Sequence, residues 1–597
     1  MSHTFHIPVL GLGFSIDTPL KVARYGISSV ISIVDDELIE RMREYHSKQH
    51  NRRFTPIFKS QPNARQQRIT TYLNLVDDLV NEQFERLKNE PFEEGTDITR
   101  YFELLPESSP LRQGYDLMLE YPDGSQKVLF ADLLRKRMTT GSVDVNIMSK
   151  VDKLNFAADG GYLGDENTDA LSALRGFAES KLHGSVILSA GMNPRLYSYL
   201  ETFSDFFPDE KGEIRKRIIL KVSDFRSAYI QAKFLAKKGL WVSEFRIESG
   251  LNCGGHAFAT DGYLLGPILE EFKEKRPVMQ DELFTMYRTA LEAKGIVTGS
   301  KPPQRISAQG GIGTEEEHNF LREYYHLDAA GWGSPFLLVP EVTNVDQETM
   351  AQLGAAREED FQLSGASPLG ILFNTFKKSS IEKQRQERLK RGRPGSPCTK
   401  KYLVNNTEFT EQPICTASRE YQHLKIKQLR SLQLPEDEYK KEEDKVTEKI
   451  CLCEGLCSSA YIKYDISKPK ENTAVAICPG PNLAYFGRSY SLDEMVKHIY
   501  GRLDLLCKVT RPNMFIKELD LYIDYLQKEL QSHLKDMNDK KRKHLDNFKA
   551  QLQEGIDYYK QLFGHWPGFA SDAVKVLFSD LADSERKLNG ILIEAGN

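Results

Sequence analysis

The sequence predicts an α/β protein built around a (β/α)8 TIM barrel. Short β-rich runs alternate with amphipathic helical stretches along the first 350 residues. The apolar residues of these runs are nearly continuous, as in parallel strands that are buried on both faces. Several runs stop at Gly, Ser or Asn, where a loop to the next helix would begin. The predicted strands span residues 6–10, 27–34, 143–147, 185–189, 217–222, 242–247, 304–308 and 328–331.

The stretches between these strands support helices, among them residues 224–238 and 314–325. An open doubly wound sheet is the alternative. Its usual signature, G-x-G-x-x-G after the first strand with an acidic residue about 20 positions on, is missing. In a closed barrel the active site lies at the carboxyl ends of the strands.

The composition restricts the class of protein. The chain has 597 residues, of which 40% are hydrophobic, and its net charge is −5. This apolar fraction excludes global disorder, and the balanced charge argues against a general nucleic-acid binder. We find no apolar run of the ~18 residues that a membrane span needs, and the first residues do not resemble a signal peptide. We therefore expect a cytoplasmic protein without a membrane partner.

We divide the chain into three parts: a barrel over residues 1–350, a cysteine-containing extension over 351–510, and a helical hairpin over 511–597. The barrel carries a helical insertion, residues 35–140, after its second strand. This insertion would either cap the barrel mouth or decorate the surface. Apolar residues at spacings of three and four over 513–563 predict the hairpin, which would pack on the barrel or join two copies in an oligomer.

Glycine-rich loops follow four of the predicted strands. They are Gly11-Leu12-Gly13, GLNCGGH (250–256), AQGGIGT (308–314) and GWGSPF (331–336). Glycine lets the backbone approach a flat ligand closely. His256, behind Gly254-Gly255, is a candidate general base near neutral pH. Loops after the seventh and eighth strands of such barrels commonly bind phosphate, here beside a helix that Thr314 and Glu317 would cap.

These loops resemble those of a known family. GLNCGGH is similar to the G-x-E-A-G-G-H motif of the nitronate monooxygenase (2-nitropropane dioxygenase-like) FMN barrels. IPVLGLGF, SVDVNI, LKVSDF, SAQGGIGT and GWGSPFLLVPE resemble other segments of that family in the same order, over roughly residues 5–35 and 140–345. The resemblance implies an FMN-dependent oxidoreductase in which His256 does acid–base work beside the flavin.

The resemblance also implies where the cofactor would lie. Gly310, Gly311, Gly333 and Ser334 would hold the phosphate, whereas Gly11, Leu12, Asn146 and Lys221 would line the ribityl chain and the ring. The full implied cofactor site is Gly11, Leu12, Gly13, Asn146, Lys221, Ser223, Gly254, Gly255, Gln309, Gly310, Gly311, Gly333 and Ser334.

The resemblance, together with the positions that depart from the family pattern, leaves three functions open. Asn252 and Cys253 replace the acid and the alanine of the family motif, and the chain continues to residue 597, past the usual end of the family. Related FMN barrels are trans-acting enoyl reductases of polyunsaturated-fatty-acid and polyketide synthesis. The chain is therefore a nitronate monooxygenase-like enzyme for a small molecule, an enoyl-reductase-type enzyme that uses NAD(P)H on acyl substrates, or a non-catalytic binding or scaffold barrel.

Seven of the eight cysteines lie beyond residue 390. Cys451, Cys453, Cys457 and Cys478 could hold an iron–sulfur cluster or zinc. The alternative is a set of reduced, partly buried thiols, because C-x-C-x3-C is not a usual metal-binding spacing and reducing compartments disfavour disulfides. A basic run over residues 383–393 would bind an anionic partner or form a solvated helix.

Overall fold

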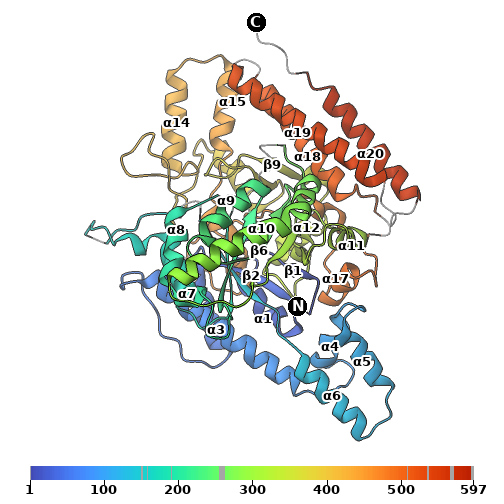
Figure 1. Cartoon of the computed structure of the whole chain (residues 1–597). Coiled ribbons are helices and arrows are strands. Elements are labelled where there is room, and N and C mark those ends of the chain that lie inside the picture. Colours follow the sequence, from blue (N-terminus) through green and yellow to red (C-terminus); the bar gives the residue numbers. More distant parts are fainter. Residues whose placement is uncertain are drawn as a thin grey trace.

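The computed structural model describes residues 2–149, 152–157, 159–189, 191–254, 262–506, 509–533, 537–564 and 571–592. Eight parallel strands close into a barrel in sequential order (Figure 1). The predicted fold class is therefore confirmed, and the open sheet is excluded. The strands are β1 (Phe5–Ile7), β2 (Ser28–Ser32), β3 (Val143–Ile147), β4 (Gly184–Leu188), β5 (Lys216–Val222), β6 (Val242–Glu248), β7 (Arg305–Gln309) and β8 (Ala329–Gly331).

Helices between the strands cover the barrel. The predicted helices 224–238 and 314–325 are α9 (Phe225–Ala236) and α11 (Glu315–Glu323). Asp224 and Thr314 cap them, since each side chain accepts a hydrogen bond from a first-turn N–H. The other helices of this layer are α1 (Thr18–Val22), α3 (Ala64–Lys88), α7 (Asp169–Ala178), α8 (Pro194–Tyr199) and α10 (Leu265–Ala293).

The insertion does not cap the barrel mouth. Besides α3, it forms α2 (Asp36–Gln49), α4 (Asp97–Leu104), α5 (Pro110–Glu120) and α6 (Ser125–Arg137). Helix α3 packs against α7 in the outer layer. Helices α4–α6 lie at the opposite end of the molecule from the extension helices α14 and α15 (Figure 1), and α6 leads into the start of β3. The capping alternative was therefore wrong.

The extension lies over the mouth instead. Its elements are α12 (Gln347–Gly354), the antiparallel pair β9 (Phe361–Ser364) and β10 (Phe373–Phe376), α13 (Ser380–Lys390), α14 (Arg419–Ser431), α15 (Glu436–Thr447), α16 (Leu452–Lys463) and α17 (Leu492–Ile499). Buried residues of α16, such as Ala460, belong to the same hydrophobic core as the barrel strands. The predicted boundary near residue 350 therefore does not separate two cores.

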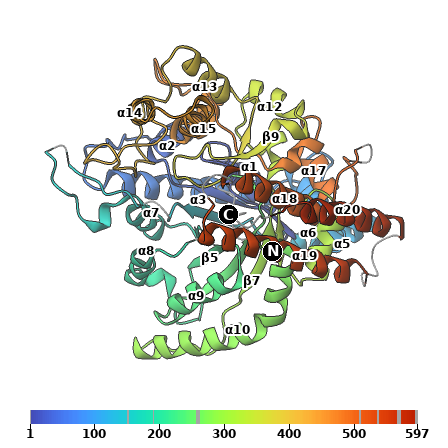
Figure 2. The same ribbon diagram turned by 90° about the horizontal axis from the view of Figure 1, so that it is seen from above.

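The C-terminal part contains three helices rather than the predicted hairpin. They are α18 (Met514–His533), α19 (Asp539–Gly564) and α20 (Ser571–Asn589), which pack on one another (Figure 2). Helices α18 and α19 also contact α10, so the predicted packing on the barrel is confirmed. Within the described ranges, no helix has the length and apolarity to cross a membrane.

Candidate functional site

A cavity of about 150 Å³ lies at the carboxyl ends of the barrel strands, and we call it the mouth cavity. Five of the residues that the family resemblance implies line it: Gly11, Leu12, Asn146, Lys221 and Gly254. The extension closes the cavity with mostly apolar side chains, which are Leu369, Phe373, Tyr402, Leu403, Leu452 and Leu456. Residues far apart in the sequence therefore form one largely apolar chamber where barrel enzymes place their active sites.

An ion pair lies in the wall of this cavity. Lys221 Nζ is 2.9 Å from the Glu248 carboxylate, and both side chains are largely buried. Glu248 also accepts hydrogen bonds from the side chains of Gln309, at 2.8 Å, and Asn252. These amides orient the Glu248 carboxylate toward Lys221, and the carboxylate in turn holds the Lys221 ammonium group in one orientation at the cavity wall.

The sequence reasoning missed Glu248. The family motif carries its acid at the position of Asn252, and its replacement there suggested that a negative charge had been lost. The structure shows that Glu248, at the end of β6, supplies a carboxylate hydrogen-bonded to Asn252. The sequence signal that could have identified Glu248 is a single acidic residue at the end of a buried strand.

The hydroxyl of Ser32 indicates that a polar ligand atom belongs in this cavity. Ser32 lines the cavity and is 2% exposed, and its Oγ has no hydrogen-bond partner among the described residues. We expect Ser32→Ala to raise the free energy of unfolding by about 1 kcal/mol, because it removes an unsatisfied buried group. The same change should weaken ligand binding, measured by titration of the purified protein.

Ser29→Ala is the matched control. Ser29 Oγ is also buried without a described partner, but Ser29 does not line the mouth cavity. Its alanine variant should be stabilised similarly and should keep its ligand affinity. Equal loss of affinity in both variants would show that the Ser32 hydroxyl does not face a ligand.

The loops after β7 and β8 contact the extension. The Gly480 N–H donates to Ser334 Oγ at 2.9 Å, and the Asn482 side chain donates to the Ile312 carbonyl at 2.8 Å. A Cβ on Gly480 would lie only 2.4 Å from the Leu251 carbonyl oxygen. The segment 478–482 is therefore packed against the place that the family resemblance assigns to the cofactor phosphate.

Arg511 and Glu317 complete this arrangement. The Arg511 guanidinium donates to the Gly311 carbonyl at 2.5 Å and to Glu317 at 2.7 Å. Glu317 in turn accepts from the Gly313 N–H at 2.9 Å, at the start of α11. The Glu317 carboxylate thus already accepts at this helix N-terminus, and Arg511 neutralises its charge. The Ser334 hydroxyl and the Gly313 N–H are therefore already hydrogen-bonded within the chain, at the place that the resemblance assigns to the phosphate-binding residues Gly310, Gly311, Gly333 and Ser334.

The remaining implied residues have different places. The Gly13 N–H donates to the Leu456 carbonyl at 2.9 Å. Gly13 therefore contacts the backbone of α16 at the place where a cofactor was expected. Neither Ser223 nor Gln309 lines the mouth cavity. Gln309 donates a hydrogen bond to Glu248, which does line it. Gly255 and His256 lie outside the described residues.

The four cysteines of the possible metal site do not form a set of metal ligands. Cys457 Sγ donates to the Asp35 carboxylate at 3.2 Å, and Cys478 lies beside Cys253. Cys451 and Cys453 belong to one buried apolar cluster with Cys478. Within the described part of the chain, no group of three or more His, Cys, Asp or Glu side chains could hold a metal ion, and none of the seven described cysteines forms a disulfide.

Comparisons with known proteins found similar solved structures, among them an enoyl reductase domain and a FabK mutant. The enoyl reductase domain of MlnA, from the macrolactin biosynthesis cluster of Bacillus amyloliquefaciens, is 14% identical and covers 76% of this chain and 88% of its own, with a TM-score of 0.29. A FabK mutant from Thermotoga maritima is 10% identical and covers 63% of this chain and 80% of its own, also with a TM-score of 0.29. No protein-family profile and no curated protein matches the chain. With identities and TM-scores this low, the two likenesses carry no argument about function.

Proposed function

We propose that the protein is an oxidoreductase that binds the ring of a flavin in the mouth cavity. The observation that carries this proposal is the convergence of Gly11, Asn146, Lys221 and Gly254 on one chamber at the carboxyl ends of four strands and their loops. A flavin would supply the redox chemistry, and the protein would position it and adjust its electronics.

The polar groups of the cavity suit the edge of such a ring. Lys221 is a cation held by Glu248, and Ser32 offers an unused hydroxyl. Both are hydrogen-bond donors, as the carbonyl oxygens of a flavin require. His256 keeps its proposed role in moving a proton, on the strength of the GGH motif alone.

The packing of segment 478–482 leads to a test with two flavins. If this packing persists when ligand binds, the phosphate gains no contacts with Gly310 or Ser334. We then expect riboflavin and FMN to bind with affinities within about threefold of each other, since a well-placed charge-assisted hydrogen bond alone would change the affinity more. Fluorescence quenching on titration of each flavin into flavin-free protein measures this.

FMN that binds a hundredfold more tightly than riboflavin would contradict the packed phosphate site but keep the flavin proposal. Absence of binding by either flavin, with colourless purified protein, would refute the proposal itself. In that case the barrel would be a non-catalytic binding or scaffold protein. The extension packed against both phosphate loops is the observation that favours this second function.

The walls of the cavity favour an acyl substrate. Leu369, Phe373, Leu403, Leu452 and Leu456 present an apolar surface from the extension, and apolar surface binds hydrocarbon better than a small charged nitronate. We therefore place the enoyl-reductase-type reaction, with NAD(P)H as donor, ahead of nitronate oxidation. Anaerobic bleaching of the bound flavin by NADPH would support this order, and rapid nitronate-dependent oxygen uptake would reverse it.

A further inference from the structure

A second cavity, of about 740 Å³, lies in the extension and contains two cysteines. We call it the thiol cavity. It is lined by Cys398 and Cys415, which come from two segments of chain that are paired on either side of them. Ser396 bridges to Ser418, and Asn406 bridges to Ile414. This pairing brings the two thiols to one cavity, where both belong to the same apolar cluster.

The two thiols differ in exposure. Cys415 is 4% exposed, whereas Cys398 is only half-buried and reaches the cavity. Cys398 also has a φ of 58°, in the left-handed region that a non-glycine residue adopts at a cost. Strain of this kind persists where the surrounding structure fixes it and is frequent at functional sites.

Positive charge surrounds the more exposed thiol. Arg393, Lys401 and Arg419 line the thiol cavity, against one carboxylate, Glu420. The Nε of Arg419 is buried and has no hydrogen-bond partner among the described residues. The basic run of the sequence therefore reaches this cavity at Arg393. An anionic molecule would find cationic partners beside Cys398.

The titration of the pair agrees with this geometry. The hydrogen bond from Cys415 lowers the pKa of Cys398 to about 7, with help from Lys401 and against the effects of burial and of Glu454. The same contact and burial raise the pKa of Cys415. One partner is thus a thiolate near neutral pH, and the other keeps its proton. A nucleophilic and a resolving cysteine differ in this way.

We propose that Cys398 and Cys415 are a redox-active dithiol that reduces anionic disulfides in the thiol cavity. The Cys398 thiolate attacks one sulfur of the disulfide, forms a mixed disulfide and expels one thiolate. Cys415 then loses its proton and attacks Cys398 Sγ, which releases the second thiol. The substrate disulfide is reduced to two thiols while the cysteine pair is oxidised to one internal disulfide.

This pair is connected to the barrel through other thiols. Cys415 shares one buried apolar cluster with Cys451, Cys453 and Cys478, and Cys453 and Cys478 line the mouth cavity. The cluster therefore extends from the thiol cavity to the mouth cavity. The dithiol reaction itself does not depend on a flavin, so its test is independent of the proposed function.

The experiment uses the reduced full-length protein and oxidised glutathione as the anionic disulfide. After acid quenching, free thiols are alkylated and the peptides are mapped by mass spectrometry. We expect a Cys398–Cys415 disulfide to form first, with release of two glutathione molecules per chain. Cys415→Ser should stop at a glutathione adduct on Cys398 and release one. The control Cys457→Ser should behave like the wild type, because Cys457 lies apart from the pair at Asp35.

Charge selectivity provides a second measurement on unmodified protein. Cystamine, a cationic disulfide, should react about tenfold more slowly than oxidised glutathione at low ionic strength, and the difference should shrink in high salt. The proposal is overturned if other cysteines react first, if Cys398 reacts no faster than a thiol in a short peptide, or if cystamine reacts as fast as oxidised glutathione.

Discussion

Replacing Lys400 with methionine should lower the free energy of unfolding by about 3–5 kcal/mol, the usual cost of removing one partner from a buried ion pair. Lys400 in the extension pairs with Asp35 at the end of β2, and their side chains are only 6% and 1% exposed. Methionine keeps most of the length of the lysine stem, so the change chiefly removes the charge. The Asp35 carboxylate would stay buried without its cation.

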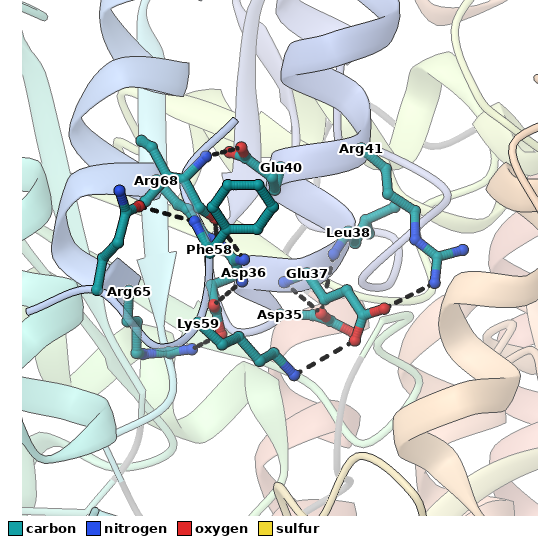
Figure 3. A network of polar contacts seen from close by, with 12 residues as sticks. Asp35, Asp36, Glu37, Leu38, Glu40, Arg41, Phe58, Lys59, Arg65 and Arg68 are labelled. Carbon is teal, nitrogen blue, oxygen red and sulfur yellow. Dashed lines mark hydrogen bonds and ion pairs between the residues drawn. The ribbon is translucent and has the colours of Figure 1, made fainter. Parts of the chain in front are cut away.

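Asp35 and Asp36 form the polar junction between the barrel and the extension. Asp35 caps α2 by accepting from two backbone N–H groups, and it also accepts from the Tyr402 hydroxyl at 3.2 Å. Asp36 binds Arg65 and Arg68, each at 2.9 Å (Figure 3). Burial would raise the pKa of Asp36, but the two arginines lower it, so its charge persists. Loss of Lys400 would therefore loosen the contact that holds the extension over the mouth.

Urea unfolding monitored by circular dichroism measures the stability change, and limited proteolysis reports release of the extension. Lys390→Met is the control, because Lys390 is exposed at the end of α13. Its stability should stay within about 0.5 kcal/mol of the wild type. A Lys400→Met variant with the stability of this control would show that the junction does not depend on the ion pair.

The barrel could be predicted because its signal is local. Each strand is a short apolar run, such as Arg217–Val222 within KRIILKV, that ends at a loop-forming residue. Burial on both faces produces that pattern wherever the strand lies in the chain. By contrast, the spacing pattern over residues 513–563 does not predict α20, although Leu577, Leu581 and Leu588 of this helix are buried.

The candidate site could be predicted only in part, because half of it depends on long-range packing. The family resemblance implied Asn146 and Lys221, which lie in segments at the ends of two strands, and both line the mouth cavity. The roles of Gly13 and Ser334 could not be predicted from their own loops. Their contacts, Leu456 and Gly480, come from an extension more than a hundred residues away in sequence. A glycine-rich loop looks the same whether its N–H groups await a phosphate or another part of the chain.

Glu518→Gln should gain about 3 kcal/mol of stability relative to the wild type between pH 4.5 and pH 8. Glu518 in α18 is fully buried and accepts hydrogen bonds from the N–H groups of Gly250, at 3.2 Å, and Leu265, at 2.8 Å. Gly250 and Leu265 lie on either side of the GGH motif in the sequence, and the Glu518 carboxyl group is hydrogen-bonded to both. Burial raises the pKa of Glu518 to about 7, although the hydrogen bonds act in the opposite direction.

The sign of the pH effect follows from proton binding. Between pH 4.5 and 7 the folded protein holds a proton on Glu518 that the unfolded chain has released. The stability linked to this proton is complete below the unfolded pKa and is lost as the pH rises through about 7. The total loss is about 3 kcal/mol, since one pKa unit corresponds to about 1.4 kcal/mol. Glutamine cannot ionise, so the variant avoids this loss. Its amide nitrogen cannot accept from Gly250 or Leu265 as the second carboxyl oxygen does, and the lost hydrogen bond lowers the stability of the variant equally at every pH.

Urea unfolding of both proteins at intervals from pH 4.5 to 8 measures the difference. The stability of Glu518→Gln relative to the wild type should rise between about pH 4.5 and pH 7, reach half of this change near about pH 6, and level off above pH 7. Glu274→Gln, on the exposed side of α10, should follow the wild type at every pH. Tyr559, which contacts the same region, does not confuse the result, because burial and Glu518 raise its pKa well above this range. A constant difference across the series would mean that Glu518 stays ionised and that its hydrogen bonds outweigh its burial.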